Sequence, residues 1–349
     1  MRNLLYPVAI LALILTLTSS CGEKITPDDP DPVVPAGTFV KGADISWVTE
    51  MESKGYKFYN AAGQERECTA LMKELGMDAV RLRVWVNPTG GWNGRDDVVV
   101  KARRAQALGM KVMIDFHYSD SWADPGKQTV PAAWKGKNAA EMAAAVKAHT
   151  QDVLQALKDA GVDVAWVQVG NEVTNGMLWD SGKVAGTNPG QFVSYFHAGY
   201  DAVKAVYPRA QVILHLDNGW KLDTLNWFLT LMKGKGLTYD ILGLSLYPSY
   251  WENGAFPDWE PKVQQFVSNL GPLHDAYGKP VMLVEFGMPA SRPDQAKAAL
   301  EYLFDNTRDK DYFLGIFYWE PEAEHDRCGY DYGAFSGGKP TAALEAFGD

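Results

Sequence analysis

Two glutamates stand where short β-rich segments end, and they are the strongest candidates for chemistry in this chain. Glu172 closes the tripeptide GNE, and Glu285 lies in the run VEFG. Two facing carboxyl groups can cleave an acetal linkage, because one protonates the leaving oxygen while the other attacks the anomeric carbon or activates water. Neither glutamate is informative alone, since a glutamate at a strand end is commonly a solvated surface residue. Whether they form a catalytic pair depends on where the fold places them.

Short β-rich runs recur along the chain from Thr38 onward, and eight of them are predicted strands. Several are nearly continuous apolar runs, which is typical of strands buried on both faces. The predicted strands are 39–45, 79–86, 111–117, 165–170, 211–216, 241–247, 281–286 and 313–319.

Helical patterns separate these strands. In the first, Cys68, Leu71, Met72 and Leu75 recur at helical spacing before Gly76. The predicted helices are 64–76, 97–108, 139–160, 191–206, 224–233, 261–277, 293–307 and 341–347. Eight strand–helix units predict an α/β fold, a (β/α)8 TIM barrel forming a single catalytic domain over 38–349. A doubly wound sheet is disfavoured, because no glycine-rich phosphate loop follows the first strand.

The active site of such a barrel lies at the C-terminal ends of its strands. Strands four and seven lie on roughly opposite walls, so Glu172 and Glu285 are expected to face each other across the mouth. His117 and His215 also stand at strand ends, where they are either hydrogen-bonded interior histidines or contacts for sugar hydroxyls.

Two tryptophans at strand ends have two interpretations. Trp319 ends the eighth predicted strand, and Trp85 lies in the second. Each ring either fills the core or stacks on the apolar face of a sugar. Stacking is favoured for Trp319, and both interpretations stay open for Trp85.

Several longer stretches resemble one known family. They are KGADISW (41–47), RLRVWVNP (81–88), DFHYSDSWADPGK (115–127) and QVGNEVTNGMLW (168–179), together with the strand-seven glutamate. The chain resembles clan A glycoside hydrolases and, more closely, glycoside hydrolase family 53, the endo-β-1,4-galactanases. The similarity extends from Phe39 to the C-terminus, and the stretch after strand three is the most specific part.

The resemblance implies endo-acting hydrolysis of β-1,4-galactosidic linkages in galactan and type I arabinogalactan by a retaining double displacement. Glu285 would be the nucleophile and Glu172 the acid/base. Arg83 would pair with Glu285 and keep it ionised, Asn171 would hydrogen-bond the sugar 2-hydroxyl, and Tyr247 would orient the nucleophile. Asp124 and Lys127 match the family's substrate-contacting loop, although a solvated surface loop is the alternative.

The segment after strand seven departs from part of this family. Bacterial members can carry calcium in a long loop there, but here the segment 287–294 is short, with one carboxylate and no histidine. Calcium takes about 6–8 oxygen ligands. We therefore predict no calcium at this place. No catalytic metal or other cofactor is expected, since HEXXH and His-x-His motifs are absent from the sequence.

The N-terminus has the pattern of a targeting segment. A basic start precedes a 14-residue apolar run, 4–17, which is too short to span a bilayer. Small residues then precede Cys21, as in a bacterial lipobox, although a plain secretory signal is the alternative. We expect a signal peptide over 1–20, and lipidated Cys21 plus a flexible linker over 21–37. The domain would be anchored to the bacterial cell envelope, at the outer membrane or cell surface, only through its lipid.

Two further cysteines, Cys68 and Cys328, would lie in a compartment that permits disulfides. Two free thiols are slightly favoured. A bridge remains open, because the first and last barrel units are neighbours at ring closure.

The composition limits the classes of partner that this protein is expected to bind. The chain has 349 residues and a formal net charge of -10, so nucleic-acid binding is not expected. The expected partner is a polysaccharide, bound by a monomer. Two alternatives remain: another clan A endo-glycanase, such as a mannanase or glucanase, and a non-catalytic glycan-capture lipoprotein.

Overall fold

The computed structural model describes residues 38–186 and 188–348, so the predicted signal peptide, Cys21 and the linker lie outside the described residues. Eight parallel strands close into a barrel, in the order β1-β10-β9-β8-β7-β6-β5-β4. The barrel strands are β1 (Val40–Asp44), β4 (Ala79–Val84), β5 (Lys111–Phe116), β6 (Trp166–Val169), β7 (Gln211–Leu216), β8 (Ile241–Leu246), β9 (Val281–Phe286) and β10 (Phe313–Trp319). The predicted (β/α)8 barrel is confirmed.

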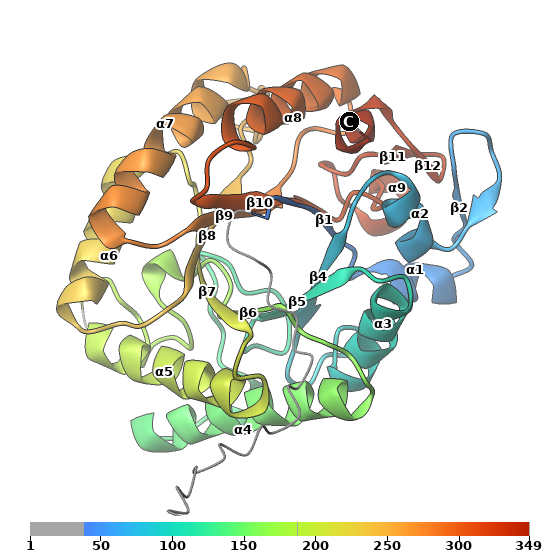
Figure 1. Ribbon diagram of the computed structural model, residues 1–349. Helices are drawn as coiled ribbons and strands as arrows, with labels where there is room; N and C mark the ends of the chain where they lie inside the picture. The colour runs from blue at the N-terminus through green and yellow to red at the C-terminus, as the bar shows by residue number, and fades with distance from the viewer. Residues whose placement is uncertain (1–37, 187, 349) are drawn as a thin grey trace, which may run out of the picture. The chain divides into compact units, whose positions relative to one another are not determined.

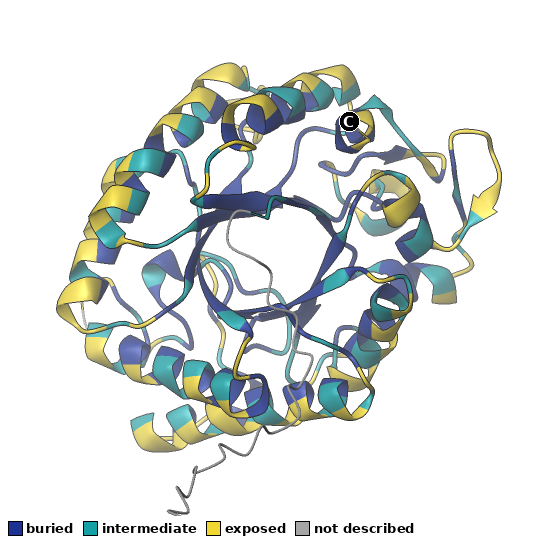
Figure 2. Cartoon of the chain, viewed as in Figure 1, coloured by how far each residue is buried: buried dark blue, intermediate teal, exposed yellow. Residues whose placement is uncertain are grey.

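Helices surround the barrel (Figure 1). They are α1 (Val48–Ser53), α2 (Cys68–Glu74), α3 (Arg95–Ala107), α4 (Ala139–Asp159), α5 (Pro189–Val206), α6 (Leu222–Gly234), α7 (Glu260–Tyr277), α8 (Pro293–Thr307) and α9 (His325–Cys328). The strands are buried, and the helices turn exposed faces outward (Figure 2). Within the described part of the chain, no helix is both long enough and apolar enough to cross a membrane.

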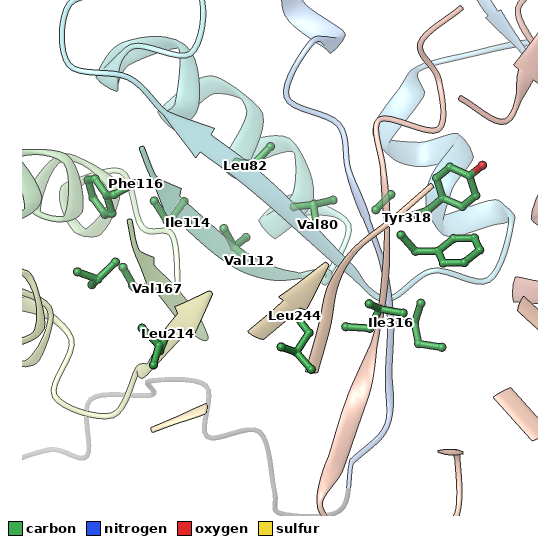
Figure 3. Packing of buried hydrophobic residues seen from close by; sticks show 14 of the residues in the cluster. Val80, Leu82, Val112, Ile114, Phe116, Val167, Leu214, Leu244, Ile316 and Tyr318 are labelled. Carbon is green, nitrogen blue, oxygen red and sulfur yellow. The ribbon is translucent and has the colours of Figure 1, made fainter. Parts of the chain in front are cut away.

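Side chains alternate along each strand between two cores. Val80 and Leu82 of β4, with Ile114 of β5, point outward into the layer between strands and helices (Figure 3). The inward positions form a second cluster that includes Met113 and Phe317 and fills the barrel. Arg81 and Arg83 alternate with the outward residues of β4 and therefore point into the barrel.

Three features differ from the sequence-based expectations. The predicted helix 64–76 is shorter, because its first residues pair in a small hairpin of β2 (Phe58–Tyr59) and β3 (Glu65–Arg66). The predicted last helix 341–347 is a 3-10 helix, Ala342–Phe347. Helix α1 was not predicted, because six residues are too few to show a helical period.

Candidate active site

A cavity of about 370 Å³ opens at the C-terminal ends of the barrel strands. Glu172 and Glu285 both line it, as do His117, Asp124, Asn171 and Tyr247. Aromatic side chains complete the wall, among them Trp122, Trp319, Tyr250 and Tyr332. The two candidate carboxyl groups thus share one solvent-connected space.

The two glutamates reach this cavity in different ways. Glu285 belongs to β9 itself and is buried. Glu172 follows β6 and has left-handed backbone angles, φ 46° and ψ 54°. A non-glycine residue in this region costs of order 1–3 kcal/mol, and such strain is frequent at functional sites. The turn carries the Glu172 side chain back over the barrel mouth.

Arg81, and not Arg83, is the partner of Glu285. Arg81 Nη2 lies 2.9 Å from Glu285 Oε1, and the guanidinium is completely buried. The same group lies 2.8 Å from Asp44 Oδ2 and 2.8 Å from Asp115 Oδ2. Arg81 therefore holds three carboxylates from three strands around one positive charge.

The prediction that Arg83 pairs with Glu285 is wrong. Arg83 forms its ion pair with Glu320, just after β10. Its guanidinium carbon lies 4.4 Å from the ring centre of Trp122 and 4.9 Å from that of Trp47. Both arginines point into the barrel because they are two residues apart on β4. Arg83 lies nearer the strand end, where tryptophans and the loop after β10 enclose it and exclude it from substrate.

Burial raises the pKa of both candidate carboxyl groups, but by different amounts. The pKa of Glu172 lies well above its usual value because the group is desolvated, and because Glu285 and Asp217 add negative charge. Burial also raises the pKa of Glu285, to about 7, while the Arg81 charge opposes this rise. The first proton therefore goes to Glu172, which leaves Glu285 as the ionised member of the pair.

Tyr247 and Asn171 both contact this centre. The Tyr247 hydroxyl donates to Glu285 Oε2 at 3.0 Å, so each oxygen of this carboxylate has its own donor. Asn171 Oδ1 accepts from Arg81 Nη2 at 2.9 Å, and Nδ2 donates to the Ala123 carbonyl at 2.9 Å. One N–H of Asn171 has no acceptor among the described residues and is available to a ligand in the cavity.

The two histidines differ in their access to the cavity. His117 lines it, but Nδ1 accepts from Trp85 Nε1 and from the Ala123 amide, both at 3.2 Å. Nε2 must then carry the proton, which it donates to Asp115 Oδ2 at 3.0 Å. His117 therefore positions Asp115 and has no ring nitrogen left for a sugar hydroxyl.

His215 is fully buried, so the prediction that it contacts substrate is wrong. Its ring nitrogens lie 3.0 Å from Asn171 Oδ1 and 2.8 Å from Ser245 Oγ. Burial and the nearby Arg81 charge lower the pKa of His215 well below its usual value, which keeps the ring neutral. The side chain lies among the inward residues of the barrel and supports Asn171 from there.

Trp85 and Trp319 both pack against Trp122, a residue that was not among those predicted from the sequence. Trp122, from the loop after β5, lines the cavity and packs against Trp85 at 5.0 Å and Trp319 at 5.8 Å between ring centres. Trp319 also lines the cavity, as expected for a stacking platform. Trp85 contacts Trp122 but is not among the residues that line the cavity. Only the distinctive stretch after strand three pointed to Trp122.

Asp124 and Lys127 form the two ends of a tight turn. Their backbone groups pair at 2.8 Å and 3.0 Å. Asp124 lines the catalytic cavity, whereas Lys127 is exposed and lines a separate pocket beyond the turn. Of the two, only Asp124 is placed to contact a ligand between Glu172 and Glu285.

The segment predicted to lack calcium is short in the structure, because β9 ends at Phe286 and α8 begins at Pro293. Over 38–186 and 188–348, no three His, Cys, Asp or Glu side chains are grouped to hold a metal ion. The expectation of a metal-free enzyme stays a prediction.

Both cysteines in the described residues are free thiols, so the alternative of a Cys68–Cys328 bridge is wrong. Cys68 is buried at the start of α2, and Cys328 is half-buried at the end of α9. Burial raises the pKa of Cys68 well above its usual value and that of Cys328 to about 11. Both thiols therefore stay protonated and weakly reactive near neutral pH.

Comparisons with known proteins agree with this geometry. Glycosyl hydrolase family 53 matches residues 40–308. The chain is 34% identical over 309 residues to an arabinogalactan endo-beta-1,4-galactanase from Humicola insolens, covering 82% of this chain and 90% of that protein. It is 32% identical over 314 residues to an endo-beta-1,4-galactanase from Bacillus subtilis, covering 81% of this chain and 70% of that protein.

Solved structures show the same fold. A fungal beta-1,4-galactanase superposes with a TM-score of 0.78 at 29% identity, over 88% of this chain and 98% of that one. The family 53 catalytic domain from Ignisphaera aggregans gives a TM-score of 0.77 at 28% identity, over 91% and 98%. The family match spans the positions of Glu172 and Glu285, and the structural similarity extends over about nine-tenths of the chain.

Proposed function

The chain belongs to glycosyl hydrolase family 53, and we propose that it is an endo-acting β-1,4-galactanase that cleaves galactan and type I arabinogalactan with retention of configuration. One observation carries the proposal. Glu172 and Glu285 line a single cavity, and their surroundings order their pKa values so that one is protonated while the other is ionised. This is the state from which a double displacement begins.

The first step breaks the glycosidic bond. Glu285 attacks the anomeric carbon while Glu172 gives its proton to the glycosidic oxygen, so the aglycone leaves as an alcohol. Arg81 and Tyr247 support the attack by holding one oxygen each of Glu285. Asn171 offers its second N–H to a sugar hydroxyl, where such a bond strengthens in the transition state.

The second step uses the same two residues in reversed roles. Once the glycosyl ester forms, Glu285 has lost its charge, which removes one cause of the raised pKa of Glu172. Glu172 then takes a proton from water, the water oxygen attacks the anomeric carbon, and the ester bond breaks. Glu285 leaves as a carboxylate, again paired with Arg81.

Substrate choice is tested by reducing-sugar release from linear β-1,4-galactan, β-mannan and cellulose. We expect activity on galactan, with a ladder of oligosaccharides early in the reaction because the cut is internal. Proton NMR of fresh product should show the β-anomer first, as retention requires. Activity on mannan or cellulose without activity on galactan would contradict the proposal, and an α-anomer first would contradict retention.

The pH dependence of kcat/KM follows from the two pKa shifts. Activity should fall as pH drops, because Glu285 gains a proton, and should fall as pH rises, because Glu172 loses its proton. The acidic limb should lie near the raised pKa of Glu285, about 7, and the alkaline limb above it. A pH–rate profile on galactan checks this, and an acidic limb near pH 4 would show that Glu285 is not desolvated as described.

We further propose that the enzyme is secreted and held at the cell envelope by a lipid on Cys21, and that it acts as a monomer without a metal or other cofactor. The lipobox-like sequence before Cys21 supports the anchor. Mass spectrometry of the membrane-extracted protein would show an acylated N-terminal cysteine, and a soluble protein with a free N-terminus would contradict it.

A further inference from the structure

A second pocket lies on the other side of the Asp124–Lys127 turn from the catalytic cavity. Its volume is about 520 Å³, within the range of ligand pockets in general. Three segments line it: the turn itself, the segment that leads into α4, and the loop after β6 that also carries Glu172. We call it the lysine pocket, after Lys127, Lys135 and Lys137 in its wall.

The lysine pocket is positively charged in an acidic protein. Lys127, Lys135 and Lys137 are exposed and line it, and none of them forms an ion pair with a described residue. Lys183 stands close by, with its Nζ 4.4 Å from the ring centre of Trp179. The one carboxylate in the wall is Asp180. Since the whole chain carries a net charge of -10, this local excess of lysines is opposite in sign to the rest of the molecule.

An aromatic ring is fixed in the same wall. The Trp179 amide donates to the Gln128 carbonyl at 2.8 Å, and its indole N–H donates to the Asn175 carbonyl at 3.0 Å. These bonds hold the half-buried ring in place beside the lysines. A fixed aromatic ring offers a face to the apolar side of a sugar, while ammonium groups attract a carboxylate.

We propose that the lysine pocket binds a uronate residue of the substrate polysaccharide. A neutral galactose ring would use Trp179 but would gain little from several unpaired lysines, whereas a free inorganic anion would use the lysines but not the ring. A carboxylated sugar uses both. This inference rests on the proposed galactanase function and extends it to galactan chains that are still attached to a uronate-containing backbone.

The catalytic cavity and the lysine pocket lie at the two ends of the Asp124–Lys127 turn, so one polysaccharide can contact both. Asp124 lines the first and Lys127 the second, and three residue steps separate them. The Gln128 side chain, in the wall of the lysine pocket, donates to the Asn171 carbonyl at 2.8 Å and to the Asp124 carbonyl at 3.1 Å. These bonds connect the wall of the lysine pocket to the backbone carbonyls of two residues that line the catalytic cavity, so a uronate in the pocket would lie near the galactoside that is cleaved.

The test is the double variant Lys135→Gln/Lys137→Gln in the full chain. Its matched control is Lys147→Gln/Lys235→Gln, which removes the same charge from two exposed lysines elsewhere. kcat/KM is measured at low and at high salt on neutral linear galactan and on galactan attached to its uronate-containing backbone. We expect the pocket variant to lose about five- to tenfold on the attached galactan at low salt only, because salt screens exposed charges. Neutral galactan and the control variant should change less than about twofold.

Direct binding gives the second readout. Trigalacturonate, which contains no β-1,4-galactosidic bond, is titrated into the wild type and both double variants by calorimetry or NMR. We expect binding to wild type and control that is weakened in the pocket variant. An equal loss on both substrates, no loss on the attached galactan, or binding of neutral galactotriose but not trigalacturonate at this pocket would overturn the inference. A wild type that cleaves no galactan but binds trigalacturonate would instead refute the proposed function.

Discussion

Replacing Glu285 with glutamine is expected to lower galactan hydrolysis by at least ~10³-fold, which corresponds to ~4 kcal/mol of transition-state stabilisation. Glutamine has nearly the shape of glutamate and its amide oxygen still accepts from Arg81 or Tyr247, but it is not a nucleophile. The variant should therefore remain folded and bind galactan while losing turnover. Initial rates on galactan and retention on a galactan affinity gel measure the two properties separately.

Glu172→Gln is the matched control, because it removes the proton donor and leaves the nucleophile. Its loss should be large on galactan but small in the first step with an aryl β-galactoside, whose leaving group needs no proton. The expected signature is a burst of released phenol followed by slow turnover, since water lacks its base in the second step.

Azide distinguishes the two roles by stereochemistry. Added to Glu172→Ala, azide should attack the glycosyl ester and yield the β-galactosyl azide. Added to Glu285→Ala, it should occupy the space of the missing carboxylate and yield the α-azide from an aryl β-galactoside. Unimpaired turnover of the Glu285 variants would show that Glu285 is not the nucleophile, and the opposite anomers would show that the two roles are assigned the wrong way round.

The barrel and the pair of glutamates could be predicted from the sequence because both depend on local patterns. Apolar runs such as 281–286 and the helical spacing in 293–307 predict elements, and the C-terminal ends of parallel strands meet at one face. Glu285 is the second-last residue of the first of these runs, so its place near that face followed from the strand alone. Glu172 followed from β6 in the same way, although its left-handed backbone did not.

The ion-pair partner of Glu285 could not be predicted from the sequence in this way. Arg81 and Arg83 both point inward from β4, and alternation alone does not say which of them reaches Glu285. Their assignment depends on the stagger of the strands and on the loop that places Trp122 over Arg83. Loops have no repeating pattern, which is also why the tyrosines of the loop after α9 were missed although Tyr332 lines the cavity. The one available signal was a charged residue in a mostly apolar strand, and it applies equally to Arg81 and Arg83.

Replacing Arg81 is expected to damage both stability and the ionisation of the nucleophile. Arg81→Met would leave the carboxylates of Asp44, Asp115 and Glu285 without their common positive charge in a buried site. Removing one partner of a buried ion pair typically costs about 3–5 kcal/mol, so the melting temperature should fall steeply. Arg81→Lys keeps the charge but not the planar fork, and it should retain more stability than Arg81→Met.

The pH profile separates a catalytic effect of Arg81 from a merely structural one. The Arg81 charge holds the pKa of Glu285 down, so its loss raises that pKa and moves the acidic limb of kcat/KM to higher pH, by about one unit or more. Arg83→Met is the matched control, since Arg83 pairs with Glu320 and not with Glu285. It should also lower the melting temperature while the acidic limb stays in place. If the acidic limb moved in Arg83→Met but stayed in place in Arg81→Lys and Arg81→Met, the ion-pair partner of the nucleophile would be Arg83 and not Arg81.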